Sequence, residues 1–65
     1  MQTTEVETWE AAGLIVQETD KAILFDDGRH EAWLPRSRIE IIPTKHGGAV
    51  IVVMPEWLAK NKGLL

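Results

Sequence analysis

The stretch KAILFDDGRHEAWLPRSRIEII, residues 21–42, decides the fold class of this chain. Asp27-Gly28 joins two short apolar runs, which predicts a β-hairpin with a type I′ turn, because that turn needs positive φ at both central residues. Pro35 cannot donate a hydrogen bond to a sheet, so the chain is expected to leave the sheet there and turn a corner through a short 3₁₀ turn. A further strand follows the corner.

The segments on either side extend this pattern. The run from Ala49 to Met54 is apolar and rich in β-branched residues, which predicts a central strand covered on both faces. Pro55 is typical of a first helical residue, and Gly63 is placed to cap a helix that ends just before it. The expected elements are strands at about 9–18, 21–26, 29–34, 38–42 and 49–54, and a helix at about 55–62.

These elements predict a mainly β fold in a single domain, residues 1–65. The expected architecture is a small five-stranded antiparallel barrel, SH3-like or OB-like, with the short C-terminal helix closing one end. Gly13 inside the first strand marks either a β-bulge or a close backbone approach.

The alternation of apolar and polar residues indicates which side chains form the core. Ala32 and Leu34 share one face of the third strand, and Ile39 and Ile41 are expected to point inward from the fourth. The helix is too short to be stable alone, so it must dock. Its expected anchors are Trp57 and Leu58.

Composition excludes several classes of site. The 65 residues include no cysteine, so there is no disulfide or thiolate metal site, and the two histidines lie in separate segments. No metal, cofactor or catalytic constellation is expected, and the chain is predicted not to be an enzyme. The N-terminus is acidic and no apolar run approaches the roughly 20 residues of a membrane helix, so a cytoplasmic location is expected.

A small domain without a disulfide or metal often gains stability by self-association. Apolar residues occur on both faces of the segments Ala22–Phe25 and Val50–Val53. We therefore expect a homodimer or larger oligomer that buries one of these faces.

One group of residues is a candidate binding site. Arginine and tryptophan are the types most enriched at energetic centres of interfaces, and four of them come from one expected strand and the corner that follows it: Arg29, Trp33, Arg36 and Arg38. Their forked donors suit carboxylates or phosphates. The competing interpretation is that Trp33 packs on the helix and the arginines pair with acidic residues of the first strand.

Residues 21–65 also show a resemblance to known proteins. Trp33-Leu34-Pro35-Arg36-Ser37-Arg38-Ile39 and the terminal Pro55-Glu56-Trp57-Leu58-Ala59 with Lys62-Gly63-Leu64 resemble small uncharacterised proteins of bacteriophages and prophages. Those chains typically read W-[I/V]-P-[K/R]-S-x-I, followed by P-x-W-L-A-x-x-K-G-L. The resemblance implies a phage origin and a compact β-rich fold, and it brings no catalytic residues.

Two classes of function follow. The first is a protein-binding module that docks on, or inhibits, a bacterial host or defence protein. The second is a nucleic-acid-binding accessory protein of phage replication or recombination, although the net charge of −3 is the reverse of the basic footprint typical of such proteins. A third alternative is an oligomer that holds a small nucleotide between subunits.

Overall fold

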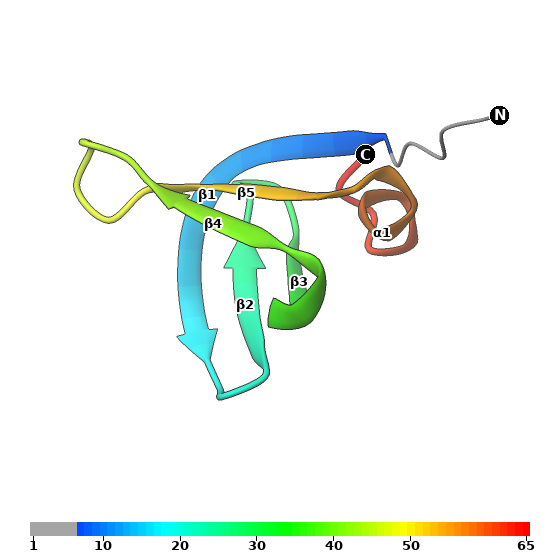
Figure 1. The fold of residues 1–65 in the computed structure, drawn as a ribbon. Helices are drawn as coiled ribbons and strands as arrows, with labels where there is room; N and C mark the ends of the chain where they lie inside the picture. Colours follow the sequence, from blue (N-terminus) through cyan, green and yellow to red (C-terminus); the bar gives the residue numbers. More distant parts are fainter. Residues whose placement is uncertain (1–6) are drawn as a thin grey trace, which may run out of the picture.

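The computed structural model describes residues 7–65 and shows five strands, a 3₁₀ turn and one helix (Figure 1). All strand pairs are antiparallel, and the strand order in the sheet is β3-β2-β1-β5-β4. The elements are β1 (Thr8–Glu18), β2 (Ala22–Asp26), β3 (Glu31–Pro35), η1 (Arg36–Arg38), β4 (Glu40–Pro43), β5 (Val50–Pro55) and α1 (Glu56–Asn61).

The mainly β fold with a short C-terminal helix is confirmed, but the term barrel applies only loosely. The described sheet is open, and β3 and β4 are its two edge strands. The turn η1 connects these edges along the chain without a ladder between them. The predicted exit from the sheet at Pro35 is confirmed, since β3 ends there and η1 begins at Arg36.

Strand β1 belongs to both halves of the sheet. Its first part, Thr8 to Gly13, pairs with β5, and its second part, Leu14 to Glu18, pairs with β2. The strand curves strongly between the two (Figure 1). A Cβ placed on Gly13 would lie 2.2 Å from the carbonyl oxygen of Asp26, so the close backbone approach predicted from the sequence is confirmed. The register shift lies further on, between Ile15 and Gln17.

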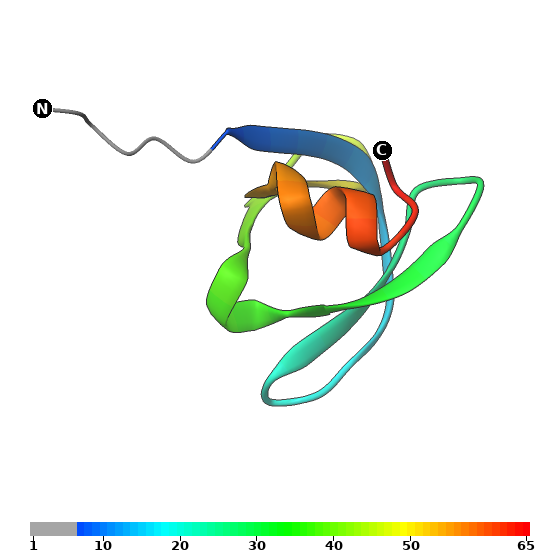
Figure 2. The same cartoon turned by 90° about the vertical axis from the view of Figure 1, so that its right-hand side faces the viewer.

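The core lies inside the curled sheet. Among residues 7–65, nine hydrophobic residues are buried in it: Ile23, Phe25, Ala32, Leu34, Val52, Met54, Leu58, Ala59 and Leu64. The predicted inward orientation of Ala32 and Leu34 is confirmed, and Ile39 and Ile41 pack against this cluster while remaining partly exposed. The helix α1 packs on β1 and β5 (Figure 2).

The helix is anchored by other residues than expected. Leu58 is 4% exposed, as predicted, but Trp57 is 50% exposed, so its predicted role as an anchor is wrong. Adjacent residues on a helix point about 100° apart, and in this six-residue helix the inward positions are taken by Leu58 and Ala59. Gly63 has φ +75°, and Leu64 donates its backbone N–H to the carbonyl of Ala59, which folds Leu64 back into the core.

Strand β5 is an inner strand, as predicted, but it is not covered on both faces. Val52 and Met54 point into the core and are fully buried. The alternate residues Ile51 and Val53 point away from the core and remain partly exposed. The sheet therefore has a buried inner face and an accessible outer face.

Candidate functional site

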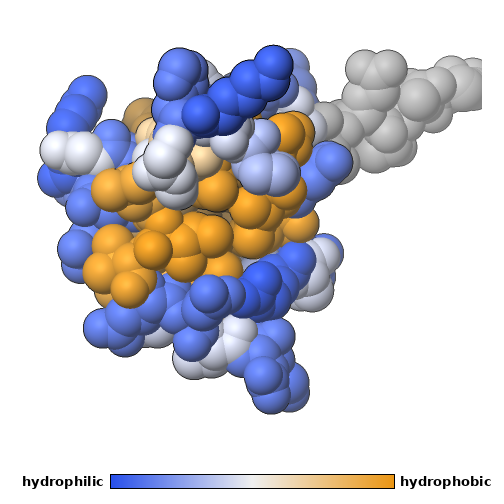
Figure 3. All heavy atoms as spheres, turned by 90° about the vertical axis from the view of Figure 1, so that its left-hand side faces the viewer, coloured by the Kyte–Doolittle hydropathy of each residue, from blue (hydrophilic) through white to orange (hydrophobic). Residues whose placement is uncertain are grey.

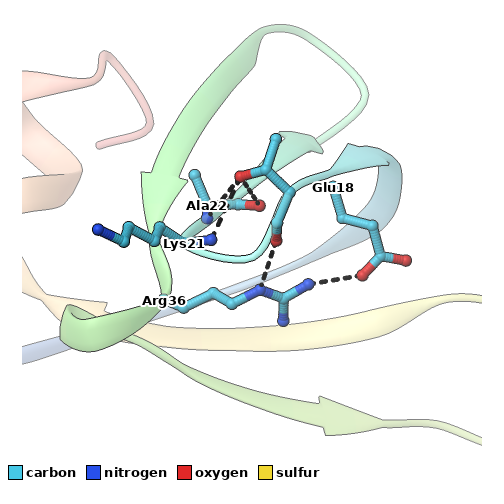
Figure 4. Close-up of polar contacts among 5 residues, drawn as sticks. Glu18, Lys21, Ala22 and Arg36 are labelled. Atoms are coloured by element: carbon cyan, nitrogen blue, oxygen red, sulfur yellow. Dashed lines mark hydrogen bonds and ion pairs between the residues drawn. The ribbon is translucent and has the colours of Figure 1, made fainter.

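Arg36 holds the start of η1 against the turn between β1 and β2 (Figure 4). Its Nη2 lies 2.6 Å from the Oε1 atom of Glu18, and its Nε donates to the carbonyl of Thr19 at 3.1 Å. Its backbone N–H donates to the carbonyl of Lys21 at 2.8 Å. Arg36 is therefore an internal counter-charge for the acidic end of β1, which is the competing interpretation of this arginine.

The other predicted site residues are spread along the edge strand β3. Arg29 is exposed in the loop before β3, Trp33 is 41% exposed in its middle, and Arg38 is exposed at the end of η1. Trp33 pairs with Leu24 of β2. All four residues lie on or beside one sheet edge, but the whole length of β3 separates Arg29 from the two arginines of η1, so they do not form one cluster.

Two shallow hollows lie on either side of η1. One is lined by residues of β1, η1, β4 and β5, including Arg38, Glu40 and Val53. The other is lined mainly by the β1–β2 turn and η1, including Arg36. Neither includes Trp33 or Arg29, so the predicted aromatic anchor and the arginines do not share a hollow.

We expect Arg36→Ala to lower the free energy of unfolding by about 1 kcal/mol or less, because the ion pair with Glu18 is largely exposed to solvent. A double-mutant cycle with Glu18→Gln, measured by urea denaturation, isolates the pair. We expect the coupling energy between the two residues to fall as the salt concentration is raised from low to molar. Strictly additive effects of the two substitutions at low salt would contradict the ion pair.

The loop between β2 and β3 is organised by aspartate side chains. The Oδ1 atom of Asp27 accepts backbone N–H groups from Arg29 and His30, both at 2.8 Å, and Asp26 accepts the N–H of Gly28 at 2.8 Å. Among the described residues only glycines have positive φ, so Asp27 does not, and the predicted two-residue type I′ turn is wrong. The side-chain hydrogen bonds instead stabilise a four-residue connection, 27–30.

These backbone donors lower the pKa of Asp27 below its ordinary value of 3.8. The hydrogen bond from the N–H of His30 contributes most, and the one from the N–H of Arg29 contributes next. A carboxylate with a lowered pKa in the folded state stabilises the fold above its unfolded-state pKa, and this contribution is lost as the pH falls through the folded-state pKa. We expect an NMR titration of the folded protein to place the midpoint of the Asp27 carboxyl below its ordinary value of 3.8. A midpoint at or above that ordinary value would contradict the loop geometry.

The outer face of the sheet carries a group of neighbouring apolar side chains. This group lies away from the edge strand β3, along which the predicted site residues are spread. Strand pairing places Ala12 of β1, Ile51 of β5 and Ile42 of β4 side by side. Leu14 and Val16 follow Ala12 on the same face of β1, as the alternating burial of that strand shows. We call these five residues, Ala12, Leu14, Val16, Ile42 and Ile51, the outer apolar patch.

Three large side chains of this patch are exposed. Leu14 is 49% exposed, Val16 47% and Ile42 40%. The side of the molecule on which β1 bends shows a broad hydrophobic area bordered by hydrophilic residues (Figure 3). Contiguous apolar surface of this kind marks interaction sites on folded proteins. The sequence indicated this patch through the apolar residues on both faces of Val50–Val53. It did not indicate that residues of β1 and β4 also contribute.

Other kinds of site have little basis in the part of the chain that the structure describes. No three histidine, aspartate or glutamate side chains among residues 7–65 are grouped closely enough to hold a metal ion. The same residues contain no helix of the length and hydropathy needed to cross a bilayer. Comparison with protein-family models, curated proteins and solved structures finds no match for this chain.

Proposed function

We propose that this chain is a non-enzymatic protein-binding module that docks through the outer apolar patch. The supporting observation is the exposure of Leu14, Val16 and Ile42 on one sheet face, next to the partly exposed Ile51. Side chains held on paired strands are already ordered, so little of their freedom is lost when a partner covers them. Burying such apolar surface is the main favourable term in most protein–protein association.

The resemblance of residues 21–65 to small phage proteins supports a bacterial host or defence protein as the class of partner. All five residues of the patch lie on β1, β4 and β5, whereas the motif that begins at Trp33 covers the end of β3 and the turn η1. The two surfaces are therefore separable by mutation. The alternative function, nucleic-acid binding, has less support because Arg36 is engaged with Glu18, and Arg29 and Arg38 lie at opposite ends of β3.

A capture experiment with matched variants tests the proposal. The tagged chain, residues 1–65, is used to capture proteins from bacterial lysate, beside a Leu14→Asp variant and an Ile42→Asp variant. The control is Trp57→Asp, because Trp57 is an equally exposed large side chain on the helix. We expect a partner that the parent and the control retain and that both patch variants lose, with circular dichroism showing unchanged folding.

The same experiment separates the patch from the edge of β3. An Arg29→Ala, Arg38→Ala double variant leaves the Arg36–Glu18 pair in place and removes the other two guanidinium groups beside β3. If this variant loses the partner while the patch variants keep it at the parental yield, the binding surface is the β3 edge and the proposal is wrong.

A further inference from the structure

The charged residues carried by the strands are all acidic. The described strands contain no lysine, arginine or histidine, while the basic residues after residue 7 lie in turns, η1 and α1. Glu18 ends β1 and is engaged with Arg36. The remaining strand acids are Glu10, Asp26, Glu31 and Glu40.

The register of the sheet places these acids at two ends of the outer apolar patch. Glu10 and Glu40 both pair with Val53, one from each neighbouring strand, so Val53 separates two exposed carboxylates. Asp26 pairs with Leu14 on one side and with Glu31 on the other. The strands therefore place carboxylates at both ends of the apolar centre, and Arg38 of η1 lines the same hollow as Glu40 and Val53 at one of these ends.

From this arrangement we infer that the partner presents an apolar surface bordered by lysine or arginine side chains. The inference rests on the proposed function and specifies the chemistry of the partner. Opposite charges around an apolar contact speed encounter and fix its register, and like charges facing each other are repelled. The inference differs from the sequence-based expectation of an oligomer that buries the Val50–Val53 face. Self-association through this patch would place carboxylates against carboxylates, because a two-fold interface uses the same patch on both subunits.

Synthetic peptides provide the test. Two amphipathic helical peptides share one leucine stripe, and their polar borders are lysine in one and glutamate in the other. Binding to the full chain is measured by fluorescence anisotropy at neutral pH. We expect the lysine peptide to bind at least about tenfold more tightly than the glutamate peptide, and to weaken as salt is raised.

Matched charge variants locate the effect on the protein. Glu10→Gln with Glu40→Gln removes two acids beside the patch, and Asp20→Asn with Glu56→Gln removes two acids from the β1–β2 turn and α1. Both variants change the net charge equally. We expect only the first to weaken binding of the lysine peptide, by about threefold or more. Equal weakening by both variants would show a non-specific charge effect and would overturn the inference.

The remaining outcomes distinguish this inference from the proposed function. If both peptides bind equally, or neither binds, the stated partner chemistry is wrong. If a captured protein depends on Leu14 but is unaffected by Glu10→Gln with Glu40→Gln, docking through the patch stands and its charge preference fails. A stable dimer at neutral pH in sedimentation, abolished by Leu14→Asp, would make a second copy the occupant and would also overturn the inference.

Discussion

Gly13→Ala is expected to lower the free energy of unfolding by about 3 kcal/mol or more. The added Cβ would lie 2.2 Å from the Asp26 carbonyl oxygen and 2.9 Å from the ring of Phe25. The nearest atom belongs to the backbone of a paired strand, so it has no side-chain rotation by which to move away. Relief would require separating β1 from β2 at the bend. Urea denaturation followed by circular dichroism measures the loss.

Gly28→Ala is the matched control for this substitution. Gly28 has φ +96°, but a Cβ there meets no atom within 4 Å. Its cost is therefore conformational, at about 1–2 kcal/mol, and a smaller loss than at Gly13 is expected. Gly13→Ala melting at or above the temperature of Gly28→Ala would show that β1 and β2 are further apart than described.

Phe25→Ala is expected to lower the free energy of unfolding by about 3–5 kcal/mol. Phe25 of β2 is fully buried and is among the largest side chains in the core. The curled sheet surrounds this side chain, so the neighbouring residues are expected to fill only part of the cavity that the substitution leaves. A domain of this size has little surplus stability, so the variant should be largely unfolded near room temperature.

Trp57→Ala provides the comparison within the same protein. Trp57 is half exposed on α1, so its removal should change the free energy of unfolding by about 1 kcal/mol or less. Denaturation curves of the two variants, recorded together, check the orientation of the helix. A larger loss for Trp57→Ala than for Phe25→Ala would mean that α1 docks by its opposite face.

Local sequence rules predicted the order of the elements and the inward residues of β3. Alternation along a strand depends only on the strand's period of two, and Pro35 removes a backbone donor wherever it lies. Local rules did not predict the conformation of the turn at Asp27. Asp-Gly favours a type I′ turn in isolation, but the Asp27 carboxylate accepts two backbone N–H groups in a longer loop, and that alternative leaves Asp27 without positive φ.

The site was harder to predict because it depends on the bend of β1. Residue types alone indicated the arginines and tryptophan near β3 and left open whether the arginines pair with acids of the first strand. They did not show that Arg36 is the arginine that does so, or that its partner is Glu18, 18 positions earlier. Ile42 and Ile51 become neighbours of Ala12 only when β1 pairs with β5. That long-range pairing, together with Gly13 at the bend, decides which apolar residues meet on the outer face.

The most direct measurement of the central claim is methyl cross-saturation NMR on the protein bound to its captured partner. The docking proposal predicts saturation transfer to the methyl groups of Leu14, Val16, Ile42 and Ile51. Leu65 is the internal control, because it is 47% exposed at the end of the chain, outside the patch. Transfer to the patch methyls without transfer to Leu65 is the expected result. Transfer confined to Leu65, or to the neighbours of Arg29 and Arg38, would contradict docking through the outer apolar patch.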